Sequence, residues 1–184
     1  MRTAGRFVAL AAVVALAACS LPTLREGGRR LSLLHDAPPS WLPVPVAGVT
    51  AAKLSDSFGD PRSGGRVHEG IGIFAPRGTP VGSATPGIVI QRGELGLGGR
   101  VVSVLGPGGY RHYYAHLDDW AAPRQGDWVE AGEVIGYVGD SGNAAGGAPH
   151  LHYGVYAPGG GAMNPYSLLV APRPAPAAAV AAGS

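Results

Sequence analysis

Short runs of apolar residues, interrupted by glycine and proline, dominate the middle of the chain. Runs of this length that are bounded by turn residues are typical of β-strands, whereas a helix shows a longer apolar pattern with a period of 3.6 residues. The Gly-Pro-Gly-Gly sequence at 106–109 lies between two such runs and predicts a hairpin turn. The predicted strands are Gly70–Phe74, Pro80–Ala84, Gly87–Arg92, Arg100–Leu105, Tyr110–Leu117, Trp128–Val129, Glu133–Val138 and His150–Tyr156.

This succession of short strands favours an all-β fold, a small antiparallel sheet or sandwich with Gly-rich loops and very little helix. Composition agrees, because the 184 residues include 31 Gly and 17 Pro, which are both poor helix formers. Hydrophobic residues make up 46% of the chain, which is enough to fill a core. Disorder of the whole chain is therefore disfavoured.

The beginning of the chain resembles an export signal. Arg2 and Arg6 precede an unbroken apolar run over 7–18, which is too short to span a bilayer but suits a signal peptide. The run ends at Cys19, the only cysteine, within a segment that resembles the lipobox of bacterial lipoproteins. This resemblance implies cleavage before Cys19 and a membrane anchor through lipid on it. The following Ser20 implies the outer membrane, with the protein facing the periplasm. The alternative is an ordinary secretory signal with a chance cysteine.

One folded domain is expected between two segments without regular structure. Residues 1–18 are the predicted signal peptide, and residues 19–45, polar and then Pro-rich, are predicted to form a tether. Residues 171–184 contain only Ala, Pro, Val, Arg, Gly and Ser, which predicts a disordered tail. The predicted domain therefore spans 46–170.

The charge balance excludes one class of partner. Removal of Arg2 and Arg6 leaves 14 − 2 = 12 basic side chains against 12 acidic ones. A neutral chain with Lys53 as its only lysine has no basic surface for nucleic acid, so nucleic-acid binding is not expected.

Histidines near the end of the predicted domain have the spacing of a possible site. His150 and His152 are two residues apart, so in a strand their side chains lie on the same face. Such a pair of imidazoles suits zinc binding and proton transfer. From spacing alone, these residues and His68 fit a metal site or a structural role equally well.

The strand over 110–117 carries two further histidines. Strict alternation places His112, Tyr114 and His116 on one face, with Tyr113 and Ala115 on the other. His112 would then lie beside His116, in either a structural or a functional role, and Tyr114 would contact a substrate or pack in the core.

Four segments carry a family resemblance: HEGIGIFAPRGTPV at 68–81, YAHL at 114–117, GDWVEAGEVIGYVGDSG at 126–142 and HLHY at 150–153. In this order they closely resemble the lysostaphin-type (LytM-like) zinc endopeptidases, which cut the cross-link peptides of peptidoglycan. The resemblance covers about residues 55–169. It implies a small antiparallel β-sheet with a groove that binds peptidoglycan peptides.

The resemblance also assigns roles to individual residues. His68 matches the first zinc ligand and His152 the last, while His116 and His150 match the two catalytic histidines that do not bind the metal. The family's second ligand is an aspartate four residues after the first, and here Gly72 stands at that position. Because glycine has no donor atom in a side chain, the implied Zn²⁺ site keeps two of its three ligands, and its affinity is expected to fall.

A carboxylate elsewhere in the chain could replace the missing ligand. Glu69 is disfavoured, because it neighbours His68 and would point to the opposite side of an extended backbone. The sequence does not place the other candidates. The carboxylates near the site segments are Asp60, Glu69, Asp118 and Asp119.

Three functions remain open from the sequence. The first is a peptidoglycan metalloendopeptidase of the cell envelope, impaired because Gly72 replaces the aspartate. The second is a catalytically inactive relative that binds peptidoglycan or regulates a partner cell-wall hydrolase. The third, a purely structural β module, is disfavoured because the four histidines are retained. We therefore expect peptidase ancestry with weakened or absent activity.

Overall fold

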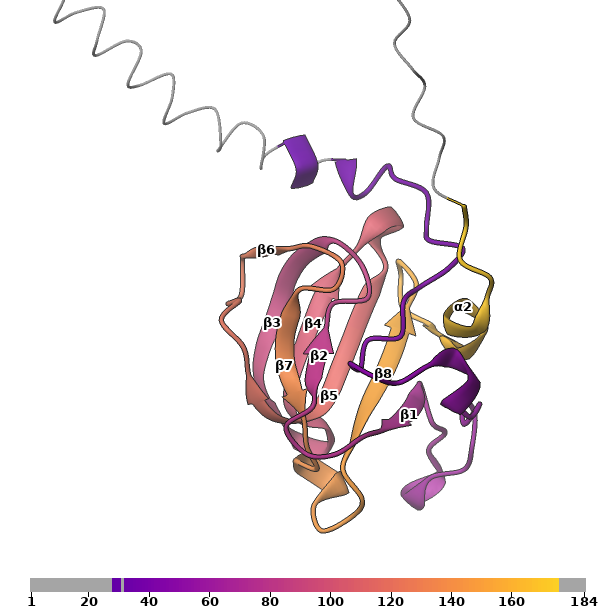
Figure 1. Cartoon of the computed structure of the whole chain (residues 1–184), viewed down its shortest axis with the longest axis vertical. Coiled ribbons are helices and arrows are strands. Elements are labelled where there is room, and N and C mark those ends of the chain that lie inside the picture. Colours follow the sequence, from indigo (N-terminus) through magenta and orange to yellow (C-terminus); the bar gives the residue numbers. More distant parts are fainter. Residues whose placement is uncertain (1–27, 31, 176–184) are drawn as a thin grey trace, which may run out of the picture.

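The computed structural model describes residues 28–30 and 32–175 (Figure 1). The predicted signal peptide, Cys19 and residues 176–184 of the predicted tail lie outside this range. Within it, no helix is long and apolar enough to cross a membrane. The elements are η1 (Ala51–Lys53), η2 (Ser63–Gly65), β1 (Ile71–Phe74), β2 (Pro80–Gly82), β3 (Gly87–Leu95), η3 (Gly96–Gly98), β4 (Gly99–Leu105), η4 (Pro107–Gly109), β5 (Arg111–Trp120), β6 (Trp128–Val129), β7 (Val134–Val138), η5 (Gly142–Ala144), β8 (His150–Tyr156), β9 (Ala162–Met163) and α2 (Tyr166–Val170).

The described strands form one nine-stranded sheet in which the paired strands are antiparallel. This confirms the predicted all-β class. The main path is β1-β8-β5-β4-β3-β6, and β7 pairs with both β2 and β5. In Figure 1, β2 and β7 lie across β4 and β5, and side chains from both layers join one apolar core.

The strands follow the alternation of residues in the sequence. In β8, Leu151 and Tyr153 are fully buried, whereas His150 and His152 face the other side of the sheet and are partly exposed. The same alternation in the neighbouring strands brings their apolar side chains to the core. The core cluster consists of Leu42, Val46, Leu54, Ile71, Ile73, Val81, Ala84, Val89, Val102, Val104, Tyr114, Leu117, Val129, Ile135, Val138, Leu151, Tyr153, Val155 and Leu169.

The described part of the predicted tether packs against the domain. Leu33 is 2% exposed and Leu42 is 1% exposed, and Leu42 belongs to the core cluster. The Leu42 N–H donates to the carbonyl oxygen of Leu168 at 3.0 Å, which joins this segment to α2. The packed part of the chain therefore begins before Val46.

The two ends of the sheet are built differently. The β3–β4 hairpin closes through η3 at one end, and the β4–β5 hairpin closes through η4 at the other, which confirms the turn predicted at 106–109. The N-terminal segment lies at the η4 end, where the Gly108 N–H donates to the Leu33 carbonyl oxygen at 2.6 Å. At the η3 end, a Cβ added to Gly99 would lie 2.3 Å from the Gly142 nitrogen, so glycine is needed for η3 and η5 to meet.

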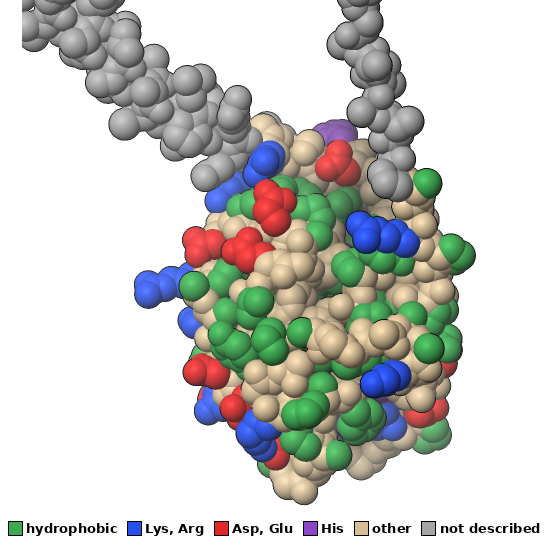
Figure 2. All heavy atoms as spheres, viewed as in Figure 1, with side chains coloured by type: hydrophobic (Ala, Val, Ile, Leu, Met, Phe, Trp, Pro, Cys, Tyr) green, Lys and Arg blue, Asp and Glu red, His purple; other side chains and the backbone are tan. Residues whose placement is uncertain are grey.

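Charged side chains are spread over the surface in small groups. Figure 2 shows basic and acidic side chains interspersed among uncharged ones on one face. One such group joins three segments, because Arg77 forms ion pairs with both Asp118 and Asp140. These pairs connect the loop between β1 and β2 to β5 and to the loop that contains η5.

Candidate active site

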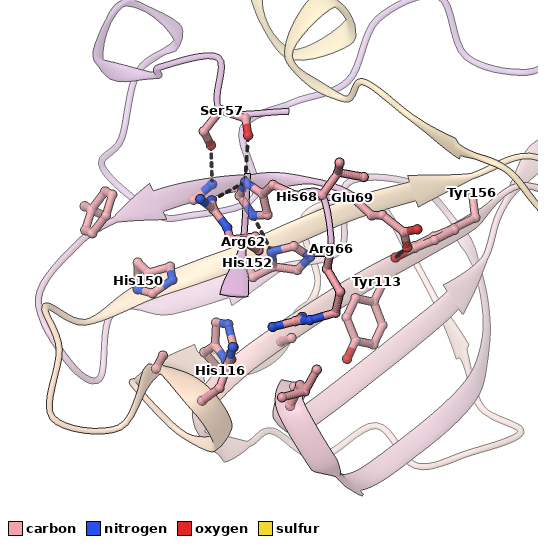
Figure 3. Close-up of a pocket in the computed structure, with 18 of the residues that line it drawn as sticks. Ser57, Arg62, Arg66, His68, Glu69, Tyr113, His116, His150, His152 and Tyr156 are labelled. Carbon is pink, nitrogen blue, oxygen red and sulfur yellow. Dashed lines mark hydrogen bonds between the residues drawn. The ribbon is translucent and has the colours of Figure 1, made fainter. Parts of the chain in front are cut away.

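A groove with a volume of about 900 Å³ opens on the face of the sheet formed by β1, β8 and β5 (Figure 3). All four histidines that the sequence singled out line it, namely His68, His116, His150 and His152. Figure 3 shows that they gather on one side of the groove, with His68 from the loop before β1, His116 from β5, and His150 and His152 from β8. The fold therefore brings together residues that are up to 84 positions apart in the sequence.

Strand pairing between β1 and β8 fixes one wall of the site. His150 lies opposite Phe74, and His152 lies opposite Gly72. Side chains at directly opposed positions of antiparallel strands have Cβ atoms about 4.5–5.5 Å apart. A Cβ added at position 72 would meet Cδ2 of His150 at 3.5 Å and the Phe74 ring at 3.6 Å, so Gly72 leaves space beside these two rings.

His68 lies just before β1 and contacts three groups. Its Nδ1 is 2.8 Å from the Ser57 carbonyl oxygen and 2.7 Å from Nη2 of Arg62, and its Nε2 is 2.8 Å from Nδ1 of His152. The carbonyl can only accept, so the Ser57 contact requires the proton on Nδ1 and leaves a lone pair on Nε2. Donation by Arg62 requires the opposite tautomer, so Nδ1 satisfies one of these two partners at a time.

The predicted arrangement of β5 is wrong in one respect. Tyr113 and Ala115 line the groove, whereas His112 and Tyr114 are fully buried in the core. His116 lines the groove with Tyr113, although strict alternation places it with His112.

A β-bulge explains this difference. The register of β5 against β4 shifts between the pairs Val102↔Tyr114 and Arg100↔Leu117, and His116 lies within the irregular step. Its φ is 62°, which makes it the one described residue other than glycine with a positive φ. A left-handed residue interrupts the alternation of strand faces, so the His116 side chain turns into the groove. Such conformations cost about 1–3 kcal/mol and occur often at functional sites.

Two backbone carbonyls fix which ring nitrogen carries the proton in His116 and in His150. Nδ1 of His116 donates to the Ser141 carbonyl oxygen at 2.9 Å, and Nδ1 of His150 donates to the Ala148 carbonyl oxygen at 2.9 Å. Each bond leaves Nε2 as the ring nitrogen that accepts a proton. The two ring centroids are 5.1 Å apart, so both rings can act on one small group between them.

Burial favours the neutral form of three groove histidines, His68, His116 and His152. It lowers the pKa of His68 and of His116 below the usual value of 6.5. It also lowers the pKa of His152 to about 3, and repulsion from His68 and His116 acts in the same direction. Neutral imidazole is the form that binds metals and accepts protons.

Several groove residues were not predicted from the sequence. Arg62 and Arg66 reach the groove from the loop before His68, Tyr113 comes from β5, and Tyr156 and Phe74 lie at its rim. The aromatic positions follow from the pairing of β1, β5 and β8, which the sequence does not specify. Nothing in the sequence pattern of the loop marks the two arginines.

Comparison with known proteins places the fold and its groove in one class, the lysostaphin-like peptidases. The family model described as "Peptidase family M23" matches residues 66–165. These residues include the four histidines and more than half of the chain, so the chain belongs to peptidase family M23.

Individual relatives agree with this assignment. The chain is 38% identical over 138 residues to the L-Ala--D-Glu endopeptidase of Bacillus subtilis (strain 168), a match that covers 69% of this chain and 42% of that protein. The lysostaphin catalytic domain of Staphylococcus simulans superposes with a TM-score of 0.56 and 30% identity, covering 61% of this chain and 88% of that one. Helicobacter pylori Csd3 gives a TM-score of 0.57 and 30% identity, covering 73% of this chain and 35% of that one. The chain thus spans less than half the length of the Bacillus relative.

Peptidases of this family are generally zinc enzymes, and a zinc ion in this groove would need donor atoms at His68, His152 and position 72. Nε2 of His68 and Nδ1 of His152 converge at 2.8 Å, and both rings are neutral. Position 72 offers space but no donor, because the nearest atom that an added Cβ would meet lies 3.5 Å away. A catalytic zinc normally has three protein ligands. The groove supplies two of them and does not fit a complete site.

No carboxylate replaces the missing ligand in the described part of the chain, where no group of three or more His, Cys, Asp and Glu could hold a metal ion. Glu69 lines the groove but accepts from the Tyr156 hydroxyl at 3.2 Å. Asp118 pairs with Arg77, and Asp119 accepts from the Trp120 N–H at 2.7 Å. Asp60, the remaining candidate, is exposed and does not line the groove.

Proposed function

We propose that this chain acts on the peptides of peptidoglycan as a cell-envelope endopeptidase whose hydrolytic step is impaired at Gly72. The observation that supports it is the convergence of His68, His116, His150 and His152 on one groove in a family M23 fold. Named relatives such as the L-Ala--D-Glu endopeptidase act on peptides of this kind. The groove of about 900 Å³ accommodates a short extended segment of such a peptide.

His116 and His150 are arranged to move protons. Their Nδ1 atoms are held by the carbonyls of Ser141 and Ala148, so each ring presents Nε2 as a proton acceptor. A positioned imidazole of this kind contributes about 10²–10⁴-fold to a hydrolysis rate. We assign to these two rings the orientation and deprotonation of the attacking water.

Zn²⁺ is the cofactor that we propose for this site, held loosely by His68 and His152. Loss of groups that merely support metal ligands costs about 10–100-fold in affinity, and loss of a ligand costs more. We therefore expect zinc binding, and activity with it, to be weak in this chain.

A second candidate is an inactive relative that binds peptidoglycan or regulates another cell-wall hydrolase. Two features favour it: Gly72 removes a metal-binding carboxylate, and Arg62 places a cation 2.7 Å from the His68 ring. Both changes disfavour a divalent cation in the groove.

Digestion of purified sacculi separates the two candidates. The full chain is incubated with sacculi and added Zn²⁺, and the released muropeptides are measured for the unaltered chain, Gly72→Asp and His152→Ala. Gly72→Asn is the matched control, since it has the shape of aspartate without the charge. We expect Gly72→Asp to release muropeptides at least about 10-fold faster than the unaltered chain.

Each outcome decides between the candidates. Digestion by the unaltered chain, abolished in His152→Ala, supports the impaired endopeptidase. Digestion by Gly72→Asp alone supports the inactive relative. If Gly72→Asp neither digests nor binds sacculi, both candidates are wrong.

We also propose that the chain is exported and carries lipid on Cys19, which anchors it in the outer membrane facing the periplasm. The support is the apolar run over 7–18 that ends beside the only cysteine. Radioactive palmitate fed to a bacterial host should label the full chain and leave Cys19→Ser unlabelled. Equal labelling of both would overturn the proposal.

A further inference from the structure

Two arginines lie on the groove wall opposite β5. Arg62 and Arg66 belong to the loop that precedes His68, where a bridge between Pro61 and Val67 brings the two ends of the loop together. Figure 3 shows Arg62 beside His68, and Arg66 reaching into the groove toward His116 and Tyr113. The loop thus brings two guanidinium groups to the site of the four histidines.

Neither arginine pairs with a carboxylate among the described residues, whereas Arg29, Arg77 and Arg100 each do. Arg66 donates to the Ser63 carbonyl oxygen at 3.2 Å and to its hydroxyl at 3.3 Å, which fixes the direction of its side chain. These two bonds use two of its five N–H groups.

Arg62 also has N–H groups that are not fully satisfied by hydrogen bonds. Its Nη2 faces Nδ1 of His68 at 2.7 Å, and its Nη1 is 3.4 Å from the Pro61 carbonyl oxygen. When Nδ1 of His68 donates to the Ser57 carbonyl, it has no lone pair for Arg62. In that tautomer the ring offers Nη2 no acceptor, and an anion bound beside Arg62 would supply one.

The charges that line the groove are unbalanced. Two guanidinium groups against the single carboxylate of Glu69 leave 2 − 1 = +1. Glu69 is already engaged by the Tyr156 hydroxyl at 3.2 Å, at the end of the groove away from Arg62 (Figure 3). Gly72 adds no carboxylate where the family has one. The groove therefore has the character of an anion site.

We propose that Arg62 and Arg66 form a subsite that binds a carboxylate of the peptide ligand, beside the His68–His152 pair. The inference deepens the proposed function and rests on it. A planar guanidinium matches a carboxylate through two parallel N–H···O bonds, which gives orientation as well as affinity. The ligand is thus an acidic peptide, and its carboxylate fixes which part of the peptide lies against His116 and His150.

Binding to chemically modified sacculi tests this subsite. Native sacculi and sacculi whose carboxyl groups have been converted to amides are each mixed with the full chain, and the bound fraction is measured by sedimentation. A chelator is present throughout, so that hydrolysis does not alter the binding. Amidation removes carboxylates and leaves phosphate groups in place, so the comparison also separates these two kinds of anion.

Matched variants separate the subsite from general charge attraction. Arg62→Gln, Arg66→Gln and the double variant are compared with the double variant Arg124→Gln/Arg173→Gln, which removes two exposed arginines outside the groove. We expect the groove double variant to bind native sacculi about 10-fold or more weakly, and the control to bind within about 2-fold of the unaltered chain. Arg62→Lys should recover only part of the loss, because an ammonium lacks the planar pair of donors.

Three results would overturn the inference. The first is equal binding of the unaltered chain to native and amidated sacculi, and the second is an equal loss in the groove and control variants. Both leave the proposed function intact. The third, no binding to either kind of sacculus, overturns the inference together with the proposed function.

Discussion

The two faces of the β5–β8 pair use the same residue types for opposite purposes. On the core face, His112, Tyr114 and Tyr153 are fully buried, and Nδ1 of His112 lies 2.8 Å from the Tyr153 hydroxyl oxygen. On the groove face, Tyr113 and His152 border open space, and the imidazole contacts another histidine. A histidine of this strand pair therefore packs in the core or borders the groove according to its face of the sheet.

The two faces also differ in how well they are filled. The Tyr114 and Tyr153 rings pack at a centroid distance of 5.2 Å, and the backbone N–H of Ala84 donates to the Tyr114 hydroxyl at 2.8 Å. On the groove face, Gly72 leaves room beside His150 and Phe74. The core face therefore holds the strands in register, and the groove face depends on that register for its geometry.

The largest expected effect comes from emptying the core face. Tyr153→Ala should lower the free energy of unfolding by about 3–5 kcal/mol, because it removes a fully buried ring and leaves a cavity. Urea denaturation followed by circular dichroism measures this loss. Tyr156→Ala, in the same strand but at the groove rim, is the control and should cost less than about 1.5 kcal/mol. Equal losses would contradict the distinction between the faces.

The second largest effect is expected at low pH, where protonation of the buried His112 should lower the free energy of unfolding. Burial lowers the pKa of His112 from 6.5 to about 4, so between these values the unfolded chain binds a proton that the folded chain excludes. The contribution of His112 to stability is therefore complete above about pH 6.5 and falls as the pH drops toward 4, by up to about 3 kcal/mol. Urea denaturation at a series of pH values measures the slope.

The variant His112→Gln provides the control for this pH dependence. Its stability should change less steeply between pH 6.5 and 4 than that of the unaltered chain. Part of the slope should remain, because burial also lowers the pKa of His68, His116 and His152. Identical slopes in the two proteins would show that His112 does not exclude protons in the folded state.

The bulge predicts that the glycine and alanine variants differ in stability with opposite signs at His116 and at His152. At His116, with φ of 62°, glycine should be more stable than alanine by about 1 kcal/mol, because only glycine takes this conformation without strain. At His152, in regular strand, alanine should be the more stable by about 0.5–1 kcal/mol. Thermal unfolding of the four variants gives both differences, and the same sign at both positions would argue against the left-handed residue.

The smallest expected change in stability is at Gly72, where the groove has space for a side chain. Gly72→Ala should stabilise the fold by about 0.4–1 kcal/mol, because its Cβ meets nothing closer than 3.5 Å and its φ is not positive. Gly70→Ala is the control two residues earlier, where the Cβ would lie 2.4 Å from the Tyr153 carbonyl oxygen. It should destabilise the fold in the same thermal unfolding measurement. Loss of stability in Gly72→Ala would mean that the space beside His150 and Phe74 is not open.

Local sequence patterns predicted most of the sheet. β8 was predicted with its observed bounds, because apolar residues alternate with histidines along it, and Gly-Pro-Gly-Gly marked the β4–β5 turn. The short elements β9 and α2 were not predicted, since neither is long enough to show a period. Leu33 and Leu42 each lie in a short apolar stretch, beside Leu34 and Trp41 respectively, within a polar and Pro-rich segment. These stretches are too short to show a period, so their burial depends on the domain that they cover.

The site was predictable only where its geometry is local. The shared face of His150 and His152 follows from the period of a strand. The position of His116 depends on its own left-handed backbone conformation, and a histidine in a strand pattern carries no local signal for that conformation. Arg62 and Arg66 lie in an irregular loop, where the sequence does not specify which way a side chain points.

The placement of the N-terminal segment determines how this protein can be held at a surface. Gly108 binds Leu33 at the η4 end of the sheet, while η3 and η5 border the groove at the opposite end. Both ends of the described chain leave the domain on the η4 side (Figure 1). Attachment of either end to a bead or a sensor chip would consequently leave the end of the groove that η3 and η5 border facing the solution, where an insoluble polymer could reach it.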